Sequence, residues 1–428
     1  MKATLNILFL LVLLALIAPE IQKKTKWFQG KALNGVSDTM TRPHPTRHTV
    51  LSGAYQRHMQ EYLEEKAGFR NSLIRLKNQL DYWLFNYTAS PGVVIGKEGW
   101  LYIESYILNY TGRTFKGTAR IDNEVRHLVT IQNQLKKRNI GFLVVFAPGK
   151  ASFYPEYIPD RYKKRQVTNY EYYRRKITAS GLNFMDLNAW FRSMKNKTPY
   201  PIYPKNGVHW TCYTIALAAD TIFKFIEKEK KIDLAEVSWK KVVVSDSMRY
   251  SDNDAGDLMN LVIPPKNIPM PYPEFIYNTQ GKTRPRVMAV ADSYWWGFAY
   301  TGITSNVFTK DNYWFYFRDI YENGIKAGKV SEVNLDKEIG KQDMVILLVT
   351  EATYELFPYG FIEAFYEKCM KEDQSMTTRI NFIIERIKNT PEWFQDIQNK
   401  AKKNKITLDE QLKLDAKYVI DQEDKEKK

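Results

Sequence analysis

Strand-length apolar runs alternate with stretches of helical spacing along most of the chain, and this alternation limits the fold more than any other sequence feature. Strands are expected at 140–146, 182–185, 286–290 and 344–349, and helices at 120–138, 167–179 and 211–228. Strands that alternate with helices form a mainly parallel sheet with helices on its faces. The sequence therefore predicts an α/β fold with a mainly parallel sheet flanked by helices.

The first residues form a separate apolar segment. Residues 7–18 are uninterrupted apolar, which is short for a spanning helix and suits the core of a signal peptide, yet no small-residue cleavage site follows. We expect an uncleaved signal anchor over residues 1–26, with a cleaved signal as the alternative. Lys23, Lys24 and Lys26 would by charge alone keep the rest of the chain in the cytoplasm. Export is nevertheless expected, because this is the one apolar segment and because of the resemblance described below.

Three further segments follow the anchor. Apolar residues at helical spacing predict a helical lead-in over residues 45–90, with a break near Gly68. A catalytic domain is expected over residues 91–375, beginning with two short strands at 93–95 and 100–103 around a glycine-bounded turn. From residue 376 to 428 the strand signals stop, and a small helical tail is predicted.

Charge and cysteine content exclude several classes of function. The 428-residue chain has a formal charge of +15 that is spread along its length, which favours an anionic environment. Zinc-finger, RRM and basic-zipper patterns are missing from the sequence, so nucleic acid is not expected as a partner. Cys212 and Cys369 have no Cys or His at ligand spacing, so no metal site is expected, and a disulfide between them is left open.

Polar residues follow four of the predicted strands. Ligands of open parallel sheets bind beyond the carboxyl ends of the strands, so these residues are expected to share one edge of the sheet. They are Lys150, Asp186, the pair Asp292 and Ser293, and Glu351.

Ser293 is the strongest candidate nucleophile at that edge. A serine at a strand-to-turn junction can expose its hydroxyl while nearby backbone N–H groups point at a developing oxyanion, although a helix cap is the common alternative. Of five histidines, His209 lies in a glycine-containing loop that leads directly into a helix, which suits a general base. The others lie in a Pro/Arg-rich stretch or on amphipathic helices: His44, His48, His58 and His127.

Several short motifs resemble, in their order, those of the SGNH-hydrolase-like alginate O-acetyltransferases. They are Gly96-Lys97-Glu98-Gly99-Trp100-Leu101-Tyr102, Pro148-Gly149-Lys150, Ser152-Phe153-Tyr154-Pro155, Gly207-Val208-His209-Trp210-Thr211 and Val290-Ala291-Asp292-Ser293-Tyr294. The similarity covers about residues 45–370. It implies an enzyme of the inner membrane, held by a single-pass anchor with its catalytic domain in the periplasm, that acetylates a secreted or cell-surface polysaccharide. It also implies a multispanning membrane acyltransferase as the acetyl source, and no cofactor.

The resemblance assigns roles residue by residue. Ser293 would be the nucleophile and His209 the base. In the family an aspartate two positions before the histidine orients it, and this sequence has Gly207 there. Asp186 and Glu351 are the substitutes we expect, and a backbone carbonyl is a further alternative. The residues expected to line the substrate cleft are Lys150, Trp210, Asp292, Tyr294, Trp295 and Trp296.

Two other functions fit the same residues. With water as the acceptor the site would make a carbohydrate esterase, and the sequence does not separate this from acetyl transfer. The missing acid at position 207 also allows a catalytically silent subunit that binds polysaccharide.

Overall fold

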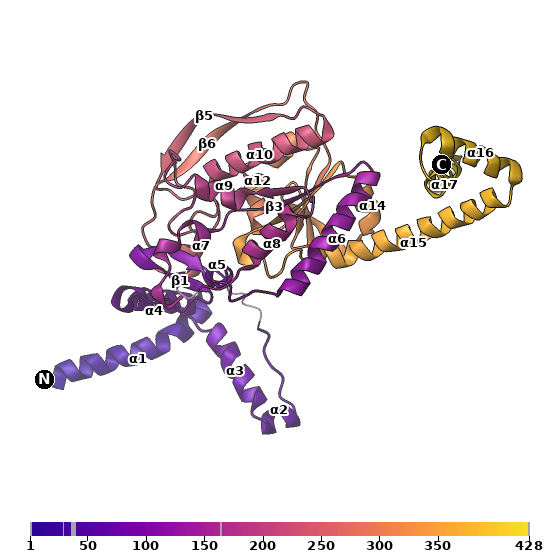
Figure 1. Cartoon of the computed structure of the whole chain (residues 1–428). Coiled ribbons are helices and arrows are strands. Elements are labelled where there is room, and N and C mark those ends of the chain that lie inside the picture. Colours follow the sequence, from indigo (N-terminus) through magenta and orange to yellow (C-terminus); the bar gives the residue numbers. More distant parts are fainter. Residues whose placement is uncertain (1, 29, 36–39, 163–164, 427–428) are drawn as a thin grey trace.

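The computed structural model describes residues 2–28, 30–35, 40–162 and 165–426, and a seven-stranded sheet forms its centre (Figure 1). The strand order is β10-β9-β8-β7-β11-β3-β4, in which β8, β7, β11, β3 and β4 run parallel and β9 and β10 continue one edge antiparallel. The bounds are β3 Gly141–Phe146, β4 Phe184–Asp186, β7 Val287–Ala291, β8 Asp311–Phe315, β9 Asp319–Glu322, β10 Ile325–Lys329 and β11 Met344–Val349. The predicted α/β fold with a mainly parallel sheet is confirmed.

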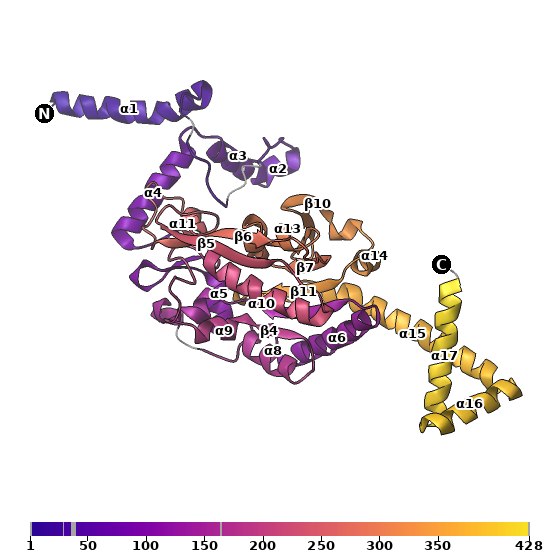
Figure 2. The same ribbon diagram turned by 90° about the horizontal axis from the view of Figure 1, so that it is seen from above.

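Both faces of the sheet are covered, because the central strands are apolar at every position. In β3, Leu143 and Val145 point into one core, whereas Phe142, Val144 and Phe146 point into the other. Helices α9 Leu187–Ser193, α10 Cys212–Lys230 and α12 Trp296–Tyr300 contribute to the first core. Helices α6 Thr118–Lys137, α8 Asn169–Thr178, α14 Leu335–Gly340 and α15 Phe361–Lys388 contribute to the second. Figures 1 and 2 show the two groups of helices on either side of the sheet.

An antiparallel hairpin, β5 Glu236–Ser245 paired with β6 Met270–Asn278, lies outside the main sheet and was not predicted. Pro271 and Pro273 stand inside β6, and proline argues against a strand when only the sequence is read. A two-stranded hairpin tolerates them because a strand at an edge has N–H positions that need no partner. The loop between the strands carries the short helix α11 Asp254–Leu258.

The helical lead-in consists of α2 Arg47–Leu51, α3 Ala54–Glu65 and α4 Arg70–Phe85, with the expected break at Gly68. A side chain at Gly68 would begin 2.0 Å from the carbonyl oxygen of Pro19 in α1 Lys2–Thr25, so only glycine allows this close approach. The short strands β1 Val93–Ile95 and β2 Leu101–Ile103 then pair antiparallel as expected. Further short helices are α5 Glu104–Tyr110, α7 Lys150–Phe153 and α13 Ile303–Val307.

The C-terminal helices project from the body of the molecule (Figure 2). α15 begins in the second core and continues to Lys388, so the expected boundary at residue 376 lies within one continuous helix. Its last part packs with α16 Pro391–Asn404 and α17 Leu408–Glu426 around a small apolar cluster of its own that includes Ile383, Ile397 and Leu412. The two cysteines are buried and form no disulfide with each other.

Candidate active site

Ser293 comes two residues after the end of β7, behind Asp292, and opens a single 3-10 turn, Ser293–Trp295, at the carboxyl edge of the sheet. The turn is held by Asp292, whose Oδ1 accepts a hydrogen bond from the Tyr294 backbone N–H at 3.1 Å. Its Oδ2 accepts hydrogen bonds from the Thr350 backbone N–H at 2.8 Å and from the Thr353 hydroxyl at 2.7 Å. Asp292 is buried and its acceptor sites are used by the protein, so it positions Ser293 and does not line the cleft as expected.

The loop that carries His209 lies at the same edge of the sheet, next to Ser293. The distance between His209 Nε2 and Ser293 Oγ is 2.8 Å, although 84 positions separate the two residues in the sequence. Both side chains remain partly exposed. The hydroxyl of Tyr294 donates a hydrogen bond to the carbonyl of Val208 at 2.6 Å, which joins the serine turn to the histidine loop. The pair therefore has the separation that proton transfer from a serine to a histidine requires.

Lys150 stabilises the loop that carries His209 through hydrogen bonds of its buried ammonium group. Its side chain is fully buried, and Nζ donates to the carbonyls of Leu101 at 2.7 Å, Lys205 at 2.8 Å and Gly207 at 2.6 Å. Three acceptors match the three N–H groups of an ammonium. Burial lowers the pKa of Lys150 well below its usual value, and the negative charge of Asp254 acts in the opposite direction. Lys150 thus supports the loop and cannot touch a substrate, contrary to the expectation for it.

The acid that orients His209 is Asp254, which the sequence analysis missed. Its Oδ2 is hydrogen-bonded to His209 Nδ1, and its Oδ1 accepts from the Val208 backbone N–H at 2.9 Å. A carboxylate on Nδ1 fixes the tautomer in which Nε2 is free to accept a proton from Ser293. Ser293, His209 and Asp254 therefore form a serine-histidine-aspartate triad.

Gly207 is compatible with this arrangement because the segment before Asp254 fills the space beside it. A side chain at position 207 would begin 2.6 Å from the carbonyl oxygen of Ser251 and 2.8 Å from that of Asp252. An aspartate two positions before the histidine would collide with this backbone. The acid instead comes from the segment that occupies the space.

The two acids expected to orient His209 have other partners. Asp186 caps α9 by accepting from the Ala189 backbone N–H at 2.8 Å, and it pairs with Arg174 at 2.7 Å. Glu351 is buried and accepts from the Ser152 backbone N–H at 3.0 Å, and burial raises its pKa to about 7. Both lie at the sheet edge, as their positions after strands required, but neither contacts the imidazole. Only an acidic run at residues 252–257 marked the alternative in the sequence.

The electrostatics of the triad favour a more basic imidazole. Burial lowers the pKa of His209, but the neighbouring Asp254, together with Asp292 and Asp252, outweighs the effect of burial, so the pKa is raised above its usual value.

The phenol of Tyr316 is a neighbour of Ser293. Burial and Asp292 raise the pKa of Tyr316 to about 12, although the neighbouring Ser293 acts in the opposite direction, so the phenol stays protonated at neutral pH.

The aromatic residues expected in the cleft are mostly core. Trp210, Tyr294 and Trp295 are buried, and the Trp295 indole donates to Asp311 at 3.0 Å. Trp296 alone among them is partly exposed, and its ring packs on Tyr321. Their positions beside the catalytic motifs thus reflect packing of the two motif segments against each other.

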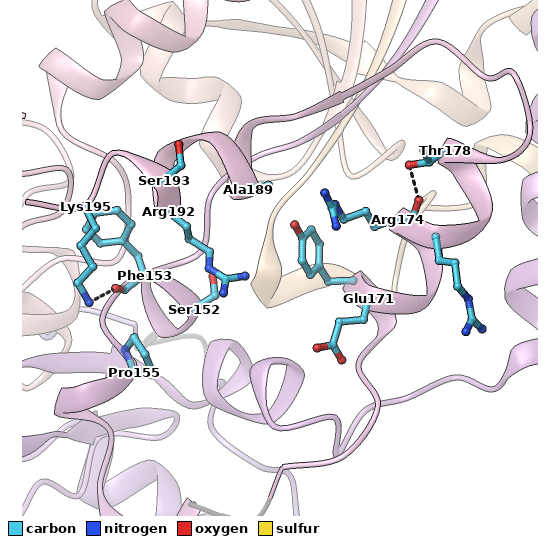
Figure 3. A pocket seen from close by; sticks show the side chains of 12 residues that line it. Ser152, Phe153, Pro155, Glu171, Arg174, Thr178, Ala189, Arg192, Ser193 and Lys195 are labelled. Atoms are coloured by element: carbon cyan, nitrogen blue, oxygen red, sulfur yellow. Dashed lines mark hydrogen bonds between the residues drawn. The ribbon is translucent and has the colours of Figure 1, made fainter. Parts of the chain in front are cut away.

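A hollow of about 950 Å³ lies further along the same edge, beyond β4 (Figure 3). Its walls carry four cationic side chains: Arg174, Arg175, Arg192 and Lys195. In the part of the chain that the structure describes, Arg174 and Lys195 pair with acids, whereas Arg192 makes no ion pair or hydrogen bond. Figure 3 shows its guanidinium pointing into the hollow beside Ser152. The triad does not line this hollow, so it is a separate feature from the chemistry.

No cluster of three or more His, Cys, Asp or Glu side chains suited to a metal ion occurs among the described residues. The described residues include one helix long and apolar enough to cross a membrane, the stretch Thr4–Thr25 of α1, with a mean hydropathy of 2.3.

The fold and the triad define an SGNH hydrolase-like domain. Residues 93–287 match the model of the family described as "SGNH hydrolase-like domain, acetyltransferase AlgX", a match that includes His209 and Asp254 and ends before Ser293. This part of the chain is therefore similar to that family.

Two curated relatives carry the same description, probable alginate O-acetylase AlgJ. The protein of Pseudomonas syringae pv. tomato is 25% identical over 190 residues, which are 43% of this chain and 46% of that protein. The protein of Pseudomonas aeruginosa is 24% identical over 177 residues, which are 40% of this chain and 41% of that protein. The chain thus spans less than half the length of the relatives it matches.

Among solved structures, the O-acetyltransferase domain of Pseudomonas putida AlgJ aligns with a TM-score of 0.42 at 14% identity, covering 66% of this chain and 99% of that domain. Bacillus cereus PatB1 with a sulfonyl adduct aligns with a TM-score of 0.39 at 10% identity, covering 61% of this chain and 97% of that one.

Proposed function

We propose that this protein is a serine-dependent O-acetyltransferase that moves acetyl groups onto hydroxyls of a secreted or cell-surface polysaccharide. The single observation that carries the proposal is the continuous hydrogen-bonded path from Ser293 through His209 to Asp254. Acetyl transfer needs a nucleophile, a base and an orienting acid, and these three residues have those chemistries. The family description, an acetyltransferase, agrees with this chemistry.

The reaction has two halves. His209 Nε2 accepts the Ser293 proton while Oγ attacks the donor's acetyl carbonyl, and the protonated imidazole then gives that proton to the departing donor oxygen or sulfur. An acetyl ester remains on Ser293. In the second half a sugar hydroxyl loses its proton to His209, attacks the ester carbonyl, and releases Ser293 Oγ, which takes the proton back.

Charge on the carbonyl oxygen develops next to the turn that Asp292 holds. We assign its stabilisation to the backbone N–H of Ser293 and to the Tyr316 hydroxyl, which lies beside it and stays protonated. No cofactor is required by these steps.

The hollow beyond β4 supports an acidic acceptor. A guanidinium that forms no ion pair within the protein can bind a sugar carboxylate with two parallel hydrogen bonds. Among the described residues Arg192 forms no such pair, although its charge acts on the buried Glu351 carboxyl. We therefore place an acidic sugar of the acceptor chain in this hollow while another sugar lies at Ser293.

The membrane location belongs to the same proposal. Helix α1 is long and apolar enough for a single-pass anchor, which would hold the domain at the periplasmic face of the inner membrane. A multispanning membrane acyltransferase would supply the acetyl group there. The catalytically silent alternative rested on Gly207, and the Asp254 carboxylate removes that ground.

A serine-directed phosphonate tests the chemistry directly. We expect it to add one adduct per protein, seen as a mass shift, and to leave Ser293→Ala unmodified. An activated acetyl ester should likewise load Ser293, and an oligosaccharide should then discharge the acetyl faster than water does. Discharge to water alone would favour the esterase, and an unlabelled wild-type protein would contradict both enzymes.

A further inference from the structure

Helix α4 carries its apolar side chains on the outside of the molecule. The six large apolar side chains Leu73, Leu76, Leu80, Trp83, Leu84 and Phe85 are 46–71% exposed. Single exposed apolar residues are common on protein surfaces, but a row along one helix face marks a contact surface. Leu73, Leu76, Leu80, Trp83 and Leu84 recur at helical spacing on one face of α4, and Phe85 is exposed at its end. In a soluble domain the apolar face of an amphipathic helix packs on the core, whereas the apolar face of α4 is exposed to solvent.

The polar face of α4 is the one that packs on the protein. Arg75 donates to the carbonyl of Leu261 at 3.2 Å, and Asn78 donates to the carbonyl of Met259 at 3.0 Å. Gln79 is buried, and its Oε1 accepts from the Ile263 backbone N–H at 2.8 Å. These bonds fix the rotation of the helix, so the apolar face cannot turn inward without breaking them.

The apolar surface begins where α1 ends. The Gln22 side chain of α1 accepts a hydrogen bond from the Phe69 backbone N–H at 3.1 Å, one residue before α4. The rings of Trp27 and Phe28 lie 5.8 and 6.1 Å from the ring of Phe69. Figure 2 shows α4 starting beside the end of α1. The start of α4 therefore lies next to the end of a helix that is long and apolar enough to cross a bilayer.

The charges at this junction suit an anionic surface. Lys23, Lys24, Lys26 and Lys31 are exposed between the apolar run of α1 and α4. Tryptophan and lysine are favoured together at the membrane interface, and lysines near the surface attract anionic lipid.

We propose that α4 lies in the headgroup region of the bilayer that α1 enters, with its Leu/Trp/Phe face at the acyl boundary. The inference rests on the proposed membrane location of α1 and names a second, independent contact with lipid. An interfacial helix of this kind binds through buried apolar area and through attraction to anionic lipid. Because α4 is fixed to the 259–263 segment of the loop that carries Asp254, this contact would also set the orientation of the active site toward the membrane.

A fluorescent probe on single introduced cysteines tests the proposal in the full-length protein. Leu80→Cys, labelled with the polarity-sensitive dye NBD, is reconstituted in protein-free vesicles of phosphatidylcholine and phosphatidylglycerol. The matched control is Ile325→Cys, another highly exposed apolar position, on β10. We expect a blue-shifted emission and quenching by brominated lipid at position 80, and neither at position 325.

A third label separates the two proposals. Leu10→Cys lies in α1 and reports insertion of the anchor independently. If position 10 is quenched by brominated lipid while position 80 stays in water, α4 does not bind lipid and its apolar face belongs to a membrane-protein partner instead. If neither is quenched, the anchor is absent and the inference falls with it. Neither label touches the triad, so acetyl transfer is scored separately.

Discussion

The carbonyl oxygen of Ser251 lies 2.6 Å from the point where a side chain at Gly207 would begin. The position at which the resembled family carries its orienting aspartate is therefore filled by backbone. The same segment delivers Asp254, three residues after Ser251, to the imidazole. In the sequence, Gly207 suggests that the acid of the triad is missing. In the structure, the absence of a side chain at Gly207 leaves room for the segment that carries Asp254.

Asp254→Asn should remove most of the activity without unfolding the protein. The amide keeps the size of the side chain but favours the wrong imidazole tautomer, which costs about 10⁴ in turnover in a serine-protease triad. The loss is measured as the rate of acetyl transfer to an oligosaccharide. Asp257→Asn is the matched control, since Asp257 lies on the same short helix and is exposed. Equal loss in both variants would contradict the role of Asp254.

Gly207→Asp should not rebuild the family's arrangement. Its side chain would push against the carbonyls of Ser251 and Asp252, and forcing extra atoms into a packed site costs about 1–3 kcal/mol. We expect lower stability in urea and lower activity. The double variant Gly207→Asp, Asp254→Asn should stay as inactive as Asp254→Asn alone, and recovery of activity would show that position 207 can supply the acid.

Lys150→Met should weaken both stability and turnover although Lys150 touches no substrate. Removal of the ammonium leaves the carbonyls of Leu101, Lys205 and Gly207 buried without their donor, at about 1–3 kcal/mol for each unsatisfied group. Thermal unfolding should begin at lower temperature, and kcat should fall more than KM rises because the His209 loop loses its support. A change confined to KM would instead place Lys150 in the substrate cleft.

Activity should depend on the protonation of His209. The imidazole must be neutral to accept the Ser293 proton, so kcat/KM should rise with pH through a pKa above the usual 6.5. Asp254→Asn removes the largest contribution that raises this pKa, so the midpoint should move to lower pH. A midpoint unchanged by that variant would argue against the His209–Asp254 contact.

Stability should show the opposite pH dependence at the same group. Because the folded-state pKa of His209 is raised, the imidazolium stabilises the fold fully below about pH 6.5, and this contribution is lost as the pH rises through the folded value. Urea unfolding at several pH values measures the free energy of unfolding of wild type and of His209→Gln. We expect the advantage of wild type over His209→Gln to shrink as the pH rises, and a difference that stays constant with pH would contradict this.

Arg192→Ala should raise KM for an acidic oligosaccharide and leave kcat and the KM for a neutral one nearly unchanged. Loss of one charge-assisted pair is worth about 1.5–3 kcal/mol, or roughly a 10- to 100-fold change in KM. Arg175→Ala is the control, since its guanidinium rests on the Tyr172 ring at the same hollow. Equal effects on both acceptors would contradict an acidic-sugar site.

The residues next to the catalytic motifs show where sequence reasoning reached its limit. Lys150, Trp210 and Tyr294 stand beside Ser293 or His209 in the fold, as their motifs suggested, but all three are buried supports. A sequence motif predicts which residues lie close together, but it does not predict which of their side chains are exposed. That distinction depends on packing between segments, which no local pattern contains.

The alternation of strands and helices, the break at Gly68 and the placement of Ser293 after a buried strand could be derived from the sequence, because each follows from spacing within a few residues. The identity of the triad acid could not. Asp254 reaches His209 across 45 positions only because an unpredicted proline-containing hairpin holds its loop against Gly207. Local order in this protein is thus set by neighbouring residues, whereas the contact that completes its active site is decided by which distant backbone fills the space beside a glycine.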